Sequence, residues 1–271
     1  MDGREAVSDH LISPATTPGS TNDEERGLTG AVLKNDKHII NRKWDTAVWN
    51  LAPCFMIIVS IIQILTFLLA DDQTNKLLRV DPVQRQELWR YLSYMLLHWG
   101  KTHLALNVAI QCVLALPLEV EQGGLRTLVV YVGGGVFGAL GACLLQPQPM
   151  VGASAGVYSL LISHLAHLYL NFNLVKYKKY RVFSVCVLAV SDICFYAFHS
   201  KTARHPPISL GAHTSGGLAG VLLGLIAYEC YDNEAVMYKK YVKYFAFTAM
   251  VLLTIASIIA ISVLPLSFFI R

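Results

Sequence analysis

The segment Val151-Gly-Ala-Ser-Ala-Gly-Val-Tyr158 places one hydroxyl group, that of Ser154, among small residues at the start of an apolar stretch. A serine hydroxyl attacks a carbonyl carbon efficiently only when a base takes its proton and hydrogen-bond donors receive the charge that develops on the substrate oxygen. Glycine and alanine let other backbones approach closely, and the first turn of a helix leaves N–H groups unpaired. We therefore interpret Ser154 as a candidate nucleophile.

A candidate base and candidate oxyanion donors lie in two other apolar stretches. His213 is near the start of one, and His103 and Asn107 are one helical turn apart near the start of another. At 1.5 Å per residue, all of these side chains should lie about 5 to 10 Å below the same membrane boundary. We predict that His213 lies about 2.6 to 3.2 Å from the Ser154 hydroxyl as general base. His103, Asn107 and the N–H of Ser154 are predicted to receive the oxyanion.

Further residues are predicted to support this pair. Tyr158 lies one turn past Ser154 and is expected to hold the imidazole of His213 by stacking. Small residues recur every four positions after His213 and form a stripe that lets a neighbouring membrane helix pack closely: Gly216, Gly220 and Gly224.

No carboxylate has an evident place as the third member of a triad. Asp192 lies in a stretch expected to run outward from Arg181, which puts it at the wrong depth, so we predict a Ser–His dyad. Asp192 and Glu119 are interpreted as hydrogen-bonded structural acids. Four other histidines have no such partners and are interpreted as structural or interfacial: His164, His167, His199 and His205.

The composition predicts an all-α, polytopic membrane bundle. The 271 residues are 54% hydrophobic and only 15% charged, with a mean hydropathy of +0.47, which is too apolar for an ordinary soluble domain. Soluble hydrolases that share the G-x-S-x-G pattern need a sheet around it, so this composition disfavours them. The net charge of +4 is mild and spread out, which predicts no nucleic-acid surface. Six cysteines without a C-x-x-C pair indicate neither a zinc site nor a disulfide framework, and no cofactor is expected.

Seven apolar runs reach membrane-spanning length: 47–70, 101–118, 125–145, 153–170, 182–198, 208–228 and 244–269. Basic clusters precede the first run and follow the fourth and the sixth, which predicts a cytoplasmic N-terminus. Residues 1–45 are polar and are predicted to form a disordered cytoplasmic tail, while 46–270 form one transmembrane domain. Acidic residues in the tail disfavour a mitochondrial transit peptide, so a membrane of the secretory pathway or the cell surface is expected.

At these residues the sequence resembles the rhomboid family of intramembrane serine proteases. The resemblance runs from about Trp89 to Glu229, and it rests on an ordered set of motifs: Glu87-Leu-Trp-Arg90, His98-Trp-Gly-Lys-Thr-His103-Leu-Ala-Leu-Asn107, Gly152-Ala-Ser154-Ala-Gly156-Val-Tyr158, and Gly211-Ala-His213-Thr-Ser-Gly216 with Gly220. A seventh segment after the six-helix rhomboid core is similar to the secretase type found in animals, whose members cleave growth-factor precursors within their membrane anchors.

The resemblance implies roles for individual residues. Ser154 would be the nucleophile and His213 the general base, with His103 and Asn107 as oxyanion donors. The supporting residues that it implies are Tyr158, Gly152, Gly216 and Gly220, together with a gate formed by the fifth segment and the loop of Trp89 and Arg90. Ala155 replaces a glycine that is common in animal members, and we expect the change to be tolerated.

The resemblance also implies partners and a location. The substrates would be single-pass transmembrane proteins, including precursors of EGF-like growth factors, cut after a small residue such as alanine. The expected membranes are those of the Golgi, endosome or cell surface. Two alternatives stay open: a catalytically silent rhomboid-like protein that binds transmembrane clients and controls their trafficking, and a transporter. Silent relatives usually lack the serine or the histidine, both of which are present here, and a transporter should show inverted repeats, which we do not find.

Overall fold

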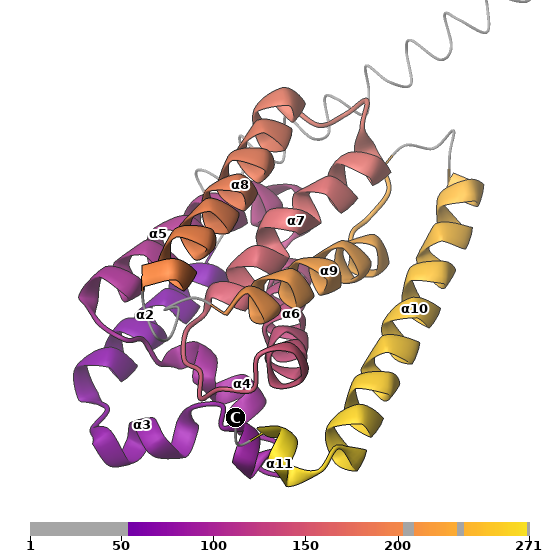
Figure 1. The fold of residues 1–271 in the computed structure, drawn as a ribbon. Coiled ribbons are helices and arrows are strands. Elements are labelled where there is room, and N and C mark those ends of the chain that lie inside the picture. Colours follow the sequence, from indigo (N-terminus) through magenta and orange to yellow (C-terminus); the bar gives the residue numbers. More distant parts are fainter. Residues whose placement is uncertain (1–53, 203–208, 232–235, 270–271) are drawn as a thin grey trace, which may run out of the picture.

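The described part of the chain is helical. The computed structural model describes residues 54–202, 209–231 and 236–269, so the predicted tail and the predicted start of the first membrane segment lie outside the described residues. The helices are α2 (Phe55–Leu69), α3 (Asp72–Leu78), η1 (Pro82–Gln84), α4 (Arg90–Ser93), η2 (Tyr94–Leu96), α5 (Lys101–Gln122), α6 (Gly124–Leu145), α7 (Ser154–Asn171), α8 (Lys178–Thr202), α9 (Leu210–Ala227), α10 (Val236–Val263) and α11 (Leu266–Phe269) (Figure 1). Each of the seven predicted apolar runs overlaps one of the helices α2 and α5 to α10, which confirms the all-α bundle with an additional C-terminal helix.

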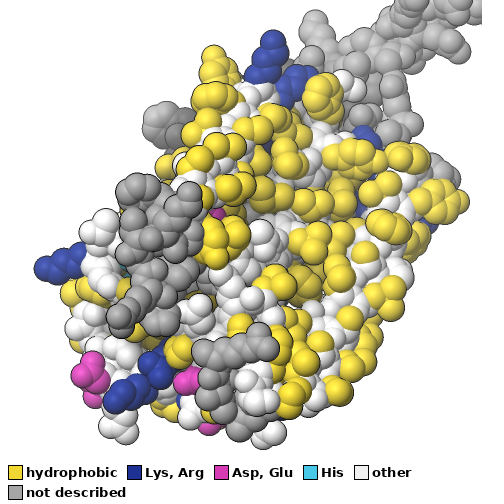
Figure 2. Space-filling model, in the orientation of Figure 1, with side chains coloured by type: hydrophobic (Ala, Val, Ile, Leu, Met, Phe, Trp, Pro, Cys, Tyr) yellow, Lys and Arg dark blue, Asp and Glu magenta, His cyan; other side chains and the backbone are white. Residues whose placement is uncertain are grey.

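The bundle has the apolar exterior of a multi-pass membrane protein. Four described helices are long and apolar enough to cross a bilayer: Lys101–Gln122, Gly124–Leu145, Leu210–Ala227 and Tyr238–Val263. Figure 2 shows hydrophobic side chains over the face that α10 presents, with charged side chains toward the ends. On α10 the side chains of Phe245 and Leu252 are 74% and 61% exposed. Such a surface is stable when lipid, and not water, surrounds it.

Glycine allows α9 to pack between α6 and α7, the two helices that it contacts most closely. A Cβ atom on Gly216 would lie 2.4 Å from the backbone oxygen of Ala155, and one on Gly220 would lie 2.2 Å from that of Ser159. On α6, a Cβ atom on Gly138 would lie 2.5 Å from the Cβ of Ala155. Membrane helices that share small residues at their contacts approach until their backbones touch. This approach brings the N-termini of α7 and α9 together.

The two ends of the bundle differ, and we refer to them as the Ser154 end and the Glu121 end. Helix α5 starts near the former and finishes at the latter. The start of α2 is at the Glu121 end, because the N–H of Met56 donates to Glu119 at 2.9 Å. The last turns of α10 are at the Ser154 end. There Arg85, which follows η1 in the segment between α2 and α5, donates to the carbonyl of Leu264 at 3.0 Å. Helix α11 lies beside η1 there (Figure 1).

Buried charges hold α8 at the Glu121 end. Arg181 of α8 donates two hydrogen bonds to the carboxylate of Glu121, at 2.6 and 2.8 Å. The Nε2 atom of His167, on α7, lies 2.8 Å from the same carboxylate. The Glu121 side chain is only 2% exposed, so these partners compensate the cost of removing its charge from water. His167 thus has a structural setting, as interpreted from the sequence.

The segment between α2 and α5 is folded into short helices, although the sequence indicates only a long loop. Arg90 is buried here, and its Nη1 atom donates to the carbonyls of Lys76 and Arg79 at 2.6 and 3.0 Å. A two-residue bridge then joins Val80 to Met150, with N–O distances of 3.0 and 2.9 Å. Because Met150 lies just before Ser154, this bridge connects the segment to the start of α7.

Candidate active site

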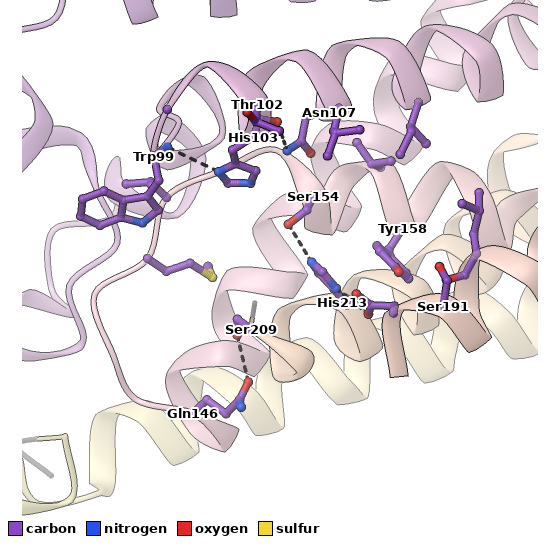
Figure 3. A pocket seen from close by; sticks show the side chains of 18 of the residues that line it. Trp99, Thr102, His103, Asn107, Gln146, Ser154, Tyr158, Ser191, Ser209 and His213 are labelled. Atoms are coloured by element: carbon purple, nitrogen blue, oxygen red, sulfur yellow. Dashed lines mark hydrogen bonds and ion pairs between the residues drawn. The ribbon is translucent and has the colours of Figure 1, made fainter. Parts of the chain in front are cut away.

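Ser154 and His213 face each other at the N-termini of two helices. Ser154 is the first residue of α7, and His213 lies in the first turn of α9 after its N-cap, Ser209. The Nε2 atom of His213 is 2.8 Å from the Oγ atom of Ser154 (Figure 3). This separation is within the range predicted from the sequence and permits direct proton transfer. The roles of nucleophile and base stay predictions.

Tyr158 fixes the plane of the His213 ring. The two rings are stacked, with centroids 4.2 Å apart and planes inclined by 11°. Tyr158 lies one turn past Ser154 on α7, so the helix that carries the hydroxyl group also carries the stacking ring. Stacking restricts the rotation of the imidazole and keeps its Nε2 atom directed at Ser154.

Asp192 lies against His213, so the prediction that it is at the wrong depth is wrong. Its Oδ2 atom is 2.8 Å from the Nδ1 atom of His213. Arg181 and His167 both contact Glu121, which gives a common level for α7 and α8. At 1.5 Å per residue, Asp192 lies about 16 Å from that level along α8, and Ser154 lies about 20 Å from it along α7. The side chains span the difference of about 4 Å between these two heights. The interpretation of Asp192 as a hydrogen-bonded acid is right, but its partner is the candidate base.

His103 and Asn107 lie on α5 and flank Ser154 on another side (Figure 3). The backbone N–H of Trp99 donates to the Nδ1 atom of His103 at 3.4 Å, so a neutral ring would carry its proton on Nε2. The Nδ2 atom of Asn107 donates one hydrogen to the carbonyl of His103 at 2.9 Å. An amide group has a second hydrogen. Both side chains therefore retain a donor for an incoming oxygen atom.

Gly152 makes room for His103. Its φ angle of 122° is in the region that favours glycine. A Cβ atom there would lie 2.7 Å from the Cε1 atom of His103. Its N–H donates to the carbonyl of Tyr94 at 3.1 Å. Any larger residue would strain the backbone and displace the ring, so Gly152 supports the site through space and conformation.

Gln146 also supports the site, although it was not among the residues predicted from the sequence. Its Oε1 atom accepts hydrogen bonds from the N–H of Gly211 at 2.8 Å and from the hydroxyl of Ser209 at 3.1 Å. The first N–H groups of a helix have no partner within it, so Gln146 completes the start of α9 two residues before His213. A polar residue directly after an apolar run was the available signal.

A cavity of about 910 Å³ opens beside the Ser154–His213 pair. Helices α5, α7 and α8 contribute apolar side chains to its wall: Leu106, Ile110, Val157 and Leu188. An apolar wall with a few polar groups is typical of a binding pocket.

Other predicted residues lie away from this cavity. Trp89 and Arg90 do not line it: the Trp89 ring is 51% exposed and donates to the carbonyl of Leu77 at 3.3 Å. Gly216 and Gly220 lie behind the pair in the contact with α7. His164 is buried, with its Nε2 atom 3.0 Å from the carbonyl of Leu114. The side chain of His199 and all of His205 lie outside the described residues. Among the described side chains, no group of three could hold a metal ion.

Comparisons with known proteins identify similar sequences. A family model described as Rhomboid domain matches residues 85–230. Rhomboid-related protein 2 of Mus musculus is 35% identical over 157 residues, which cover 56% of this chain and 52% of that protein. Rhomboid-related protein 3 of Homo sapiens is 31% identical over 223 residues, covering 72% and 54%. Inactive rhomboid-related protein 2 of Caenorhabditis elegans is 28% identical over 191 residues, covering 65% and 55%. The chain thus spans about half the length of these relatives.

Proposed function

Because this chain belongs to the rhomboid family, we propose that it is an intramembrane serine protease that cleaves single-pass membrane proteins. The observation that carries the proposal is the 2.8 Å contact between the Oγ atom of Ser154 and the Nε2 atom of His213 beside an apolar cavity. A serine that served only to let membrane helices pack closely would not require an imidazole within proton-transfer distance of its hydroxyl group. Polar groups inside a membrane protein are costly and usually functional.

In the proposed acylation step, the Ser154 oxygen attacks the carbonyl carbon of the scissile bond while Nε2 of His213 takes the hydroxyl proton. The negative charge develops on the substrate oxygen. His103, Asn107 and the backbone N–H of Ser154 would donate to that oxygen, and such donors act most strongly where water is excluded. The imidazolium then returns the proton to the leaving amine, and a covalent acyl-enzyme remains.

In the proposed deacylation step, His213 takes a proton from water, and the hydroxide formed attacks the acyl carbon. The Ser154 oxygen leaves with the returned proton, which restores the site. Water therefore has to reach the pair, and the location of Ser154 and His213 at the first turns of their helices supports such access from the Ser154 end.

The substrate has to expose its backbone. A membrane helix hides its carbonyl groups in internal hydrogen bonds, so the segment to be cut must unwind before Ser154 can reach it. We therefore propose a preference for transmembrane segments that contain glycine, proline or other weak helix formers near the cleavage site. Growth-factor precursors in secretory or surface membranes are the substrate class and location that we propose, with the N-terminus of this chain in the cytoplasm.

Labelling with a fluorophosphonate probe tests the proposal. The probe phosphonylates an activated serine: the serine oxygen bonds to phosphorus, fluoride leaves, and the base takes the proton. Purified wild-type protein in proteoliposomes should react and should cleave a single-pass model substrate. Ser154→Ala and His213→Ala should abolish both, because one removes the attacking oxygen and the other its base. Ser184→Ala, an exposed serine on α8, is the matched control and should react as the wild type does.

Two outcomes would contradict the proposal. Cleavage that continues unchanged in Ser154→Ala would overturn the nucleophile assignment. A wild-type chain that neither labels nor cleaves, beside an active rhomboid protease that does both, would favour the client-binding alternative. The similarity to a relative named as inactive is the observation that keeps this alternative in the test.

A further inference from the structure

Asp192 contacts the candidate base on the side opposite Ser154. Both ring nitrogens of His213 are therefore engaged: Nδ1 is 2.8 Å from Oδ2 of Asp192, and Nε2 is 2.8 Å from Oγ of Ser154. The His213 and Asp192 side chains are 7% and 9% exposed. Within the described part of the chain, His213 is the one cationic or titratable base within ion-pair distance of this carboxylate.

A carboxylate at Nδ1 has two chemical effects on an imidazole. It keeps the ring proton on Nδ1, which leaves the lone pair of Nε2 directed at the serine hydroxyl. It also stabilises the positive charge that forms when Nε2 takes the serine proton. We propose that Asp192 is a positioning residue that orients His213, so that the site works as a Ser–His–Asp triad and not as a dyad. The inference rests on the proposed protease function and deepens it.

The position of Asp192 in the fold gives this contact a second consequence. His213 is on α9, which is packed between α6 and α7, whereas Asp192 is on α8, which packs mainly against α7. At the Glu121 end, α8 is held by the ion pair of Arg181 with Glu121. Toward the Ser154 end, Asp192 and Leu188 of the same helix line the cavity. A displacement of α8 at this end would move the carboxylate of Asp192 away from the imidazole of His213. The base is therefore fully oriented only when this end of α8 is packed against α7.

Two substitutions at this position test the inference in the full chain. Asp192→Asn keeps the shape of the side chain, and Asp192→Ala opens space in the cavity wall. For both we expect the maximal rate of fluorophosphonate labelling to fall about 10²- to 10⁴-fold, the range expected when base catalysis is lost. The probe concentration at half-maximal rate should change less than about threefold, since Asp192 acts on the base and not on probe binding. Ser184→Ala on the same helix is the control.

Chemical rescue separates positioning from packing. Formate is a small carboxylate that can enter the space left by Asp192→Ala, because this residue lines the cavity. Added formate should raise the labelling rate of Asp192→Ala about tenfold or more, because it restores part of the lost base catalysis. It should leave the wild type and Ser184→Ala unchanged. Thermal unfolding of each variant in detergent reports whether the fold is intact.

The outcomes are distinct. Folded Asp192→Asn that labels within about threefold of the wild type overturns the triad while leaving the proposed protease intact. A loss of rate that matches a loss of folded protein, without any response to formate, assigns Asp192 a packing role and also overturns it. A wild type that does not label overturns the proposed function and this inference together.

Discussion

At the scale of single residues, two imidazole rings are held in complementary states by their hydrogen bonds. His213 has a carboxylate at Nδ1, so its Nε2 atom is free to accept a proton from Ser154. His103 has a backbone N–H at Nδ1, so its Nε2 atom is free to donate. The same side chain thus fits opposite roles in the proposed reaction, and the backbone or carboxylate partner decides which.

A third imidazole, that of His98, predicts a dependence of stability on pH. His98 lies between η2 and α5 and is 9% exposed. Burial, with the nearby charge of His103 as a smaller cause, lowers the pKa of His98 to about 4. The unfolded chain, with a pKa near 6.5 for this group, binds the proton first as the pH falls. The stability that neutral His98 contributes is therefore fully present above about pH 6.5 and is lost progressively down to about pH 4.

Melting temperatures of the purified protein in detergent between pH 7 and pH 4.5 measure this effect. We expect His98→Gln to lose about 5 to 10 °C less than the wild type across that window, because glutamine does not titrate. The comparison cancels the effect of other groups that titrate in both proteins. Parallel curves for the two proteins would show that His98 takes up its proton equally in the folded and unfolded chains.

The residues of the site were predictable to the extent that each lies near the start of an apolar run. Ser154, His213 and Tyr158 could be placed because serine and tyrosine are one turn apart and the runs that carry Ser154 and His213 start at the same membrane boundary. Asp192 could not, because its depth was judged along its own stretch from Arg181, with no level in common between that stretch and the one that carries Ser154. The level shared by Arg181 and His167 through Glu121 becomes apparent only in the folded chain.

At the scale of elements, the contact between α7 and α9 determines whether the Ser154–His213 pair forms. We predict that Gly220→Ala destabilises the protein by about 1 to 3 kcal/mol, the usual cost of overpacking. The added Cβ atom would lie 2.2 Å from the backbone oxygen of Ser159, and a backbone cannot yield as a side chain can. Thermal unfolding and the fraction of labelled Ser154 would both report the loss.

Gly217→Ala is the matched control for this prediction. Its Cβ atom would lie 3.2 Å from Cγ1 of Ile162, a side-chain atom that has to shift by only a few tenths of an ångström. Both substitutions gain the same helix propensity, so a difference between them isolates the contact with the neighbouring backbone. Equal stability of the two variants would mean that α7 and α9 separate at no cost.

Helix positions followed from hydropathy better than helix lengths did. The fifth run was predicted over 182–198, but α8 extends over Lys178–Thr202. The charged residues at the start of α8 lower the local hydropathy, so the predicted run begins after them. In the structure they are helical, and Arg181 among them pairs with the buried carboxylate of Glu121. The short helices α3 and α4 were missed for a related reason: they are held by side chains such as Arg90, which donates to carbonyl groups far along the chain.

At the scale of the whole molecule, the lipid bilayer acts as the solvent of the outer helices. We predict that Leu252→Lys lowers the fraction of protein that is stably inserted, at a cost of about 2.5 to 3.5 kcal/mol for a lysine near the middle of a span. Leu252 lies near the middle of Tyr238–Val263 and is 61% exposed. Extraction of membranes at alkaline pH measures the inserted fraction.

Tyr241→Lys is the comparison for the substitution at Leu252. Tyr241 is 67% exposed and lies near the start of the same helix. A lysine there can extend its ammonium group to the membrane surface, so we expect full insertion. If Leu252→Lys inserts as completely as Tyr241→Lys does, the exposed face of α10 is turned toward protein or water and not toward lipid.

The opposite locations of Met56 and Leu264 determine how the molecule can be observed in sealed vesicles. Met56 is at the Glu121 end, while Leu264 is tied to the segment before the site at the Ser154 end. The described chain therefore begins on one side of the bilayer and ends on the other. A dye or an antibody that cannot cross the bilayer and that recognises the region of α11 would report on the compartment from which water enters the site, and a marker placed before α2 would report on the other.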